Sequence, residues 1–131
     1  MSIELRMLVY SAALLFILIL VQAQAGVAAE GLARMAGPRD DVPSPTGFAG
    51  RAKRTVNNHI EGLVVFAPLL IAAVIAHRVN HWTAMGAQFY FFGRLAHAAL
   101  YLLGVPWLRS IAYMVTVAGM VLVFLADIGV I

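Results

Sequence analysis

Polar and ionisable side chains recur at helical spacing inside stretches that are otherwise apolar. Three groups stand out: Arg51, Arg54, Asn58 and Glu61; Arg94, His97 and Tyr101; and Arg109, Ser110 and Tyr113. Steps of three or four residues place the members of the first two groups, and Arg109 with Tyr113 in the third, along one face of a helix. Ser110 lies beside Arg109. An ionisable side chain in hydrocarbon is costly unless it faces protein or water, so these residues are the first candidates for function.

Depth along the helices relates the three groups to one another. Glu61 lies about 15 Å beyond Arg51 along a helix that rises about 1.5 Å per residue. Arg94, counted back from the end of its own helix near Leu103, lies at a similar depth. We therefore predict an ion pair between Arg94 and Glu61. The remaining members lie nearer one end, where they would form a basic, hydroxyl-rich cavity suited to a small anion that carries carboxylates.

Each group also has a purely structural interpretation. The basic residues near Arg51 are typical of interfacial anchors, and Lys53 is best explained that way. His97 alone would be a buried core residue, and Tyr101 and Tyr113 could belong to an aromatic belt. Glu61 with Arg94 could serve only the structure. The convergence of three groups on one region favours a functional site.

The composition excludes an ordinary soluble domain. The chain has 131 residues, of which 63% are hydrophobic and 11% charged, and its mean hydropathy is +0.91. It has no cysteine, so thiol chemistry would need a thiol supplied by a substrate. The net charge of +3 is explained by membrane orientation, and no nucleic-acid partner and no metal are expected. The length leaves room for about four spans of about 20 residues and excludes a multidomain enzyme.

Apolar runs separated by turn-forming residues predict an all-α integral membrane protein with an up-down-up-down four-helix bundle. The expected spans are 5–29, 51–76, 82–103 and 107–128, within a single membrane domain covering residues 1–131, and a long connection occupies 30–50. The stretch Ala23 to Gly26 also resembles a signal-peptidase site. The full spanning length of the first run, and Glu4 offsetting Arg6, favour a retained span.

The distribution of Lys and Arg predicts the orientation. The side that holds the first and third connections carries Arg34, Arg39, Arg51, Lys53, Arg54 and Arg109, whereas the other carries Arg6 and Arg78. The positive-inside rule places the long connection in the cytoplasm and both termini on the non-cytoplasmic side.

Other chemistries find little support. The sequence has no HExxH, P-loop, GxSxG or dinucleotide-binding motif. A haem would need His59 and His97 as axial ligands, but His59 lies off the face shared by Arg54, Asn58 and Glu61. Small multidrug exporters use a carboxylate in the middle of their first span, and none is present there. A transporter that uses Glu61 and Arg94 is a weaker alternative.

Two segments resemble the MAPEG family, the membrane-associated proteins in eicosanoid and glutathione metabolism. Arg51 to Pro68, RAKRTVNNHIEGLVVFAP, is similar to the family's arginine-rich start of the second helix, followed by Asn, Glu and an aromatic and proline pair. Phe92 to Tyr113, FGRLAHAALYLLGVPWLRSIAY, is similar to its Arg-x-x-His-x-x-x-Tyr followed by Pro, Arg-Ser and Tyr. Thr55, Val56 and Asn57 depart from glutathione-using relatives.

The resemblance implies a homotrimer that binds glutathione near the cytoplasmic face, between subunits. Arg51, Arg54, Asn58, Glu61, His97 and Tyr101 would bind glutathione, while Arg109, with Ser110 and Tyr113, would stabilise its thiolate. The implied protein is a bacterial inner-membrane glutathione transferase or peroxidase that acts on hydrophobic small molecules from the lipid bilayer. The alternative is a noncatalytic member that binds a lipid or a protein, since some relatives bind lipids without catalysis.

Overall fold

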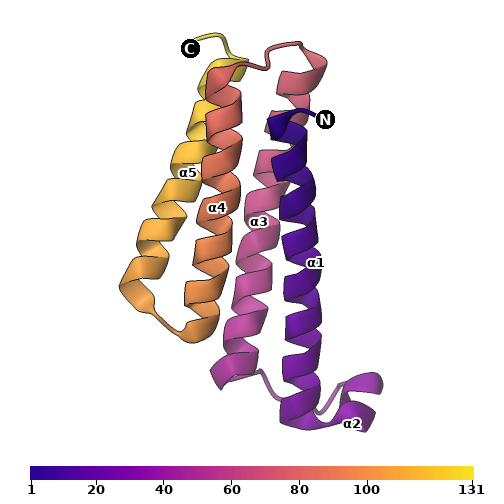
Figure 1. Ribbon diagram of the computed structural model, residues 1–131. Coiled ribbons are helices and arrows are strands. Elements are labelled where there is room, and N and C mark those ends of the chain that lie inside the picture. The colour runs from indigo at the N-terminus through magenta and orange to yellow at the C-terminus, as the bar shows by residue number, and fades with distance from the viewer.

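The computed structural model describes residues 1–131 and contains only helices (Figure 1). They are α1 (Ile3–Glu30), α2 (Leu32–Ala36), α3 (Gly47–Ile75), α4 (His81–Leu103) and α5 (Pro106–Asp127). The four long helices lie side by side and alternate in direction, and the short α2 lies at one end beside the end of α1. The all-α class is confirmed.

Local sequence signals account for the helix ends. Ser2 caps α1, and Asn80 caps α4 in a capping box with Thr83, so backbone N–H groups in the first turns find side-chain partners. Gly104 ends α4 in the left-handed region, with φ 76°. Pro106 then opens α5 at a position where its missing N–H carries no cost.

The connection expected at residues 30–50 is more ordered than the sequence suggests. It contains α2, and α3 begins at Gly47 rather than near Arg51. Arg34 accounts for part of this order, because its guanidinium lies 2.8 Å from a Glu30 carboxylate oxygen and donates to the Asp41 carbonyl at 2.8 Å. The charges in this segment therefore fold it back onto itself.

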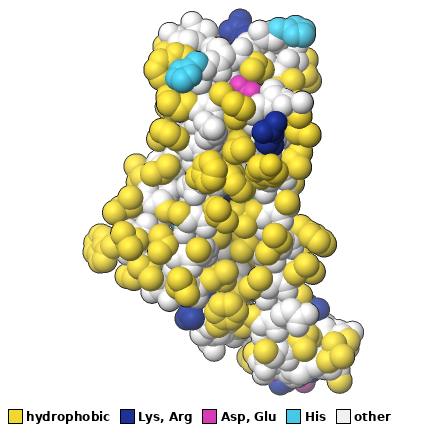
Figure 2. All heavy atoms as spheres, in the orientation of Figure 1, with side chains coloured by type: hydrophobic (Ala, Val, Ile, Leu, Met, Phe, Trp, Pro, Cys, Tyr) yellow, Lys and Arg dark blue, Asp and Glu magenta, His cyan; other side chains and the backbone are white.

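Three helices, α1, α3 and α5, are long and apolar enough to cross a membrane. Only 27 of the 131 residues are buried within the chain, so most apolar side chains face outward. Figure 2 shows them covering the middle of the visible face, with basic and histidine side chains mainly toward the two ends. Apolar surface of this extent needs lipid around it, and the protein is an integral membrane protein.

Small residues let α4 and α5 pack backbone against backbone. A Cβ added to Gly119 would lie 2.5 Å from the Gly86 carbonyl oxygen, and one added to Gly93 would lie 2.6 Å from the Thr116 hydroxyl oxygen. Such close approach is typical of membrane helix pairs. It fixes the α4 and α5 faces that carry the candidate site.

Candidate functional site

Tyr101 on α4 lies at the centre of a basic cluster formed with α3 and α5. Arg54 Nε donates to the Tyr101 hydroxyl at 3.0 Å, and the Arg109 guanidinium carbon lies 4.5 Å from the Tyr101 ring centroid. The His97 ring lies 5.6 Å from Tyr101 and 6.1 Å from Tyr113, measured between centroids. The structure thus brings together residues from all three polar groups.

A small cavity lies deeper in the bundle. Asn58, Glu61, Arg94 and Tyr113 are among the residues that line it, as the depth estimate predicts for Arg94 and Glu61. Its volume is about 130 Å³. Pockets for drug-sized ligands have about 300–1,000 Å³. One chain therefore does not enclose the anion-binding cavity expected from the sequence.

The predicted ion pair between Arg94 and Glu61 is not formed in this structure. Both salt bridges in the chain are made by Arg34. Arg94 Nε instead donates to His59 Nδ1 at 3.4 Å, and His59 Nε2 lies 3.1 Å from the Ser11 carbonyl oxygen. Arg94 is 1% exposed whereas Glu61 is an exposed residue, so the guanidinium is held by a neutral partner in the interior although both residues line the same cavity.

Several buried polar atoms around this cavity have no hydrogen-bond partner. They are Asn58 Oδ1, Arg94 Nη2, His97 Nδ1 and the Tyr90 hydroxyl. A Cβ added to Gly62 would lie 3.1 Å from that hydroxyl and 3.9 Å from the Arg94 guanidinium carbon, which places Tyr90 beside Arg94. An unpaired buried polar group costs about 1–3 kcal/mol. A cluster of such atoms leaves hydrogen-bond donors and acceptors available to a polar ligand or to water.

The positive charge of the region is not neutralised within the chain. Arg51, Arg54, Arg94 and Arg109 have no carboxylate oxygen within 4.0 Å, because both salt bridges belong to Arg34. Guanidinium groups bind carboxylates through charge-assisted, often paired, hydrogen bonds. The arrangement is therefore suited to a ligand with more than one anionic group.

Two predicted site residues make local contacts instead of joining the cluster. Arg51 Nε donates to the Leu102 carbonyl at 3.1 Å, which satisfies an otherwise free acceptor at the end of α4. Ser110 is exposed and donates to the Pro106 carbonyl at 3.4 Å. Neither contact connects these side chains to Tyr101.

Comparison with protein-family models adds the decisive observation. The MAPEG family model matches residues 7–128, which include both segments that resemble this family. The chain belongs to the MAPEG family. Comparison with curated proteins and with solved structures finds no match.

Sequence reasoning on this MAPEG protein missed two residues of the buried region, His59 and Tyr90. His59 lies off the face shared by Asn58 and Glu61, yet it is fully buried. Both of its ring nitrogens are engaged, by Ser11 and by Arg94, which leaves none free for the haem iron considered above. Tyr90 lies four residues before Arg94, and this spacing, which places both on one helix face, is the sequence signal that could have identified it.

Proposed function

We propose that this MAPEG protein binds glutathione and uses its thiolate to conjugate or reduce hydrophobic electrophiles that enter from the bilayer. The observation that carries the proposal is that Arg54, Arg94 and Arg109 have no carboxylate partner and lie in the region where several buried polar atoms lack hydrogen bonds. Arg51, also without a carboxylate partner, lies nearby at the end of α4. Glutathione offers two carboxylates, one ammonium group and a thiol, and these complement such a site.

The two ends of the peptide would be held by α3. Arg51 and Arg54 suit the carboxylates, and Glu61, which has no cation within 4.0 Å, suits the ammonium group. Asn58 Oδ1 is free to accept a hydrogen bond from the peptide. On α4, His97 Nδ1 is also unpaired and Tyr101 already orients Arg54, so both would complete the binding surface.

The thiol would be activated by α5. A thiol is mostly protonated at neutral pH, and a nearby guanidinium favours the thiolate, which is the nucleophile. Arg109 has this role in the proposal, because Tyr101 holds its guanidinium by stacking and leaves its N–H groups without an acidic partner. Ser110 and Tyr113, both exposed on α5, would donate hydrogen bonds to the sulfur.

The proposed assembly is a homotrimer, and α4 is proposed to form a fourth membrane span in each chain. The α4 helix has 23 residues, enough to cross about 30 Å of hydrocarbon. The cavity of one chain is small, and Glu61 and Tyr113 are exposed at its edge. A neighbouring subunit would supply the missing wall.

The orientation proposed from the basic residues places both termini on the non-cytoplasmic side of a bacterial inner membrane. The connections at the α2 end and between α4 and α5 lie at the same end of the bundle (Figure 1). Six of the eight residues used for the orientation lie on that side. The site would then open toward the cytoplasm.

Glutathione binding to the purified protein in detergent tests the proposal, measured by calorimetry. We expect Arg109→Ala and Arg51→Ala each to weaken binding by about 1 kcal/mol or more, or about fivefold, as lost charge-assisted hydrogen bonds do. Arg6→Ala removes the same charge near the start of α1, at the end of the bundle opposite to the site, and serves as the matched control. A folded wild-type protein that binds no glutathione would exclude the proposal.

The alternative is a noncatalytic member in which the same residues hold a lipid or a partner subunit. The exposed positions of Glu61, Ser110 and Tyr113 also fit a contact between subunits. Glutathione-dependent turnover of an aryl halide or a lipid hydroperoxide discriminates the two, provided that assembly is monitored. Loss of turnover in Arg109→Ala with assembly intact supports catalysis, whereas loss of assembly in Glu61→Ala without any turnover in the wild type supports the alternative.

A further inference from the structure

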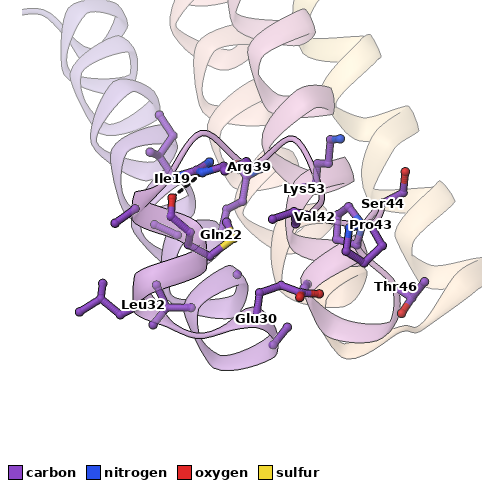
Figure 3. Close-up of a pocket in the computed structure, with 18 residues that line it drawn as sticks. Ile19, Gln22, Glu30, Leu32, Arg39, Val42, Pro43, Ser44, Thr46 and Lys53 are labelled. Carbon is purple, nitrogen blue, oxygen red and sulfur yellow. Dashed lines mark hydrogen bonds between the residues drawn. The ribbon is translucent and has the colours of Figure 1, made fainter.

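A second, much larger cavity lies at the α2 end of the molecule, and its lining residues are different from those of the candidate site. It has a volume of about 620 Å³ and is formed by α1, α2, the connection that follows and the first turns of α3 (Figure 3). This volume is within the range of about 300–1,000 Å³ that ligand pockets occupy. None of the residues assigned to glutathione lines it.

One part of the cavity is apolar and another is basic. Its apolar wall includes Ile19, Ala23, Val27, Leu32, Met35 and Val42. Its charged lining residues are Arg39, Lys53 and Glu30, and the Glu30 carboxylate is already paired with Arg34 at 2.8 Å. Arg39 Nε donates to the Met35 carbonyl, whereas neither Arg39 nor Lys53 has a carboxylate within 4.0 Å. The cavity therefore keeps two uncompensated positive charges beside an apolar wall.

The position of the cavity along α1 corresponds to the edge of the bilayer. From Met7 to Val21 this helix has no charged or amide side chain, and Gln22, which lines the cavity, ends that stretch. Residues beyond Gln22 therefore reach the level of the lipid headgroups. Basic pockets at this level bind the headgroups of anionic lipids.

We propose that this cavity binds one anionic phospholipid from the surrounding leaflet. The phosphate would pair with Arg39 and Lys53, close to the hydroxyl groups of Ser44 and Thr46 that also line the cavity. The first part of an acyl chain would lie against the apolar wall of α1 and α2. The phospholipid would thereby join the α2 segment to α3, independently of glutathione binding.

Titration of the full-length protein in detergent with phosphatidylglycerol and with phosphatidylcholine, followed by native mass spectrometry, tests the charge requirement. We expect phosphatidylglycerol to bind at least tenfold more tightly, and Arg39→Gln or Lys53→Gln to reduce this preference about fivefold or more. Arg6→Gln removes one charge from an exposed position near the start of α1, at the other end of the bundle, and should change the preference less than twofold. Equal affinities for the two lipids, or equal losses in the control, would overturn the proposal.

A cavity-filling variant tests the apolar part of the site. A Cβ added to Gly26 would lie 2.8 Å from the terminal methyl carbon of Met35, so Gly26→Leu places its side chain in the cavity while both cations remain. We expect phosphatidylglycerol affinity to fall about tenfold in this variant. Unchanged affinity contradicts the placement of the acyl chain, provided that circular dichroism shows the wild-type helix content.

A water-soluble headgroup separates a lipid site from a site for free phosphate esters. Glycerol 1-phosphate carries the phosphate but no acyl chain, and each buried methylene contributes about 0.8 kcal/mol, or about fourfold in affinity. We therefore expect it to bind at least a hundredfold more weakly than phosphatidylglycerol. Comparable affinities would identify a soluble phosphate ester as the ligand and overturn the lipid proposal. Glutathione binding should be unchanged in Arg39→Gln, so failure here is distinguishable from failure of the proposed function.

Discussion

At the scale of single residues, Tyr101 and His59 both contact arginine side chains, but with different effects on the accessibility of the guanidinium groups. Tyr101 contacts Arg54 through its hydroxyl and Arg109 through its ring, and His59 contacts Arg94 through a ring nitrogen. None of these arginines has a carboxylate partner. The Tyr101 contacts leave Arg54 and Arg109 partly accessible, so these guanidinium groups remain available to a ligand. The His59 contact is fully buried and ties Arg94 to α1 through Ser11. The first arrangement suits binding and the second suits stability.

His59→Leu should therefore destabilise the protein by about 3 kcal/mol, since it leaves Arg94 Nε and the Ser11 carbonyl without partners in a buried site. Unfolding by increasing fractions of sodium dodecyl sulfate in mixed micelles measures this free energy. His81→Leu makes the same substitution at an exposed position at the start of α4 and should change it by less than about 0.5 kcal/mol. Equal stabilities of the two variants would contradict a structural role for His59.

At the scale of elements, the close packing of α4 and α5 positions the second and third polar groups. Gly86 and Gly119 allow the two backbones to meet, and Gly93 accommodates the Thr116 hydroxyl. This contact sets the rotation of α5 relative to α4, and with it the position of Arg109 over Tyr101. The glycines act on the site without touching it.

Gly119→Ala should cost about 2 kcal/mol of unfolding free energy, because the added methyl group overlaps the Gly86 carbonyl and forces the helices apart. The same micelle titration measures it. Ala118→Val adds more volume at the neighbouring, exposed residue and should have little effect. Glutathione affinity is expected to fall in Gly119→Ala as well, since Arg109 moves with α5. A stable Gly119→Ala protein would show that the helices have room to adjust.

Much of the helical framework could be predicted from the sequence because its signals are local. Apolar runs mark the long helices, and the turn-forming residues between the third and fourth runs lie where α4 ends and α5 begins. Periodicity gives the face of a residue on its own helix, but not the rotation of one helix against another. For this reason the depth of Arg94 was predictable, whereas its choice of His59 over Glu61 was not. The folded connection around Arg34 depends on similar non-local contacts.

At the scale of the whole molecule, the candidate site is an open surface. The cavity beside Arg94 holds about 130 Å³, and Tyr113 at its edge is 42% exposed. A tripeptide bound there would remain largely in contact with its surroundings, where its charges would gain little from the guanidinium groups. For the proposed glutathione binding, a further wall would exclude water from these charges, and a second copy of the chain is the simplest source of one.

Glutathione affinity should consequently depend on assembly. We expect native mass spectrometry to detect glutathione on trimers in a mild detergent, and calorimetry to detect binding at least tenfold weaker after a harsher detergent separates the chains. Circular dichroism provides the control, because the separated chains must keep their helices for the comparison to hold. Separated, helical chains that bind glutathione as tightly as the trimer would show that one chain suffices. The site would then have to close by movement of α5 against α3, the helix pair on which Arg109 and Glu61 lie.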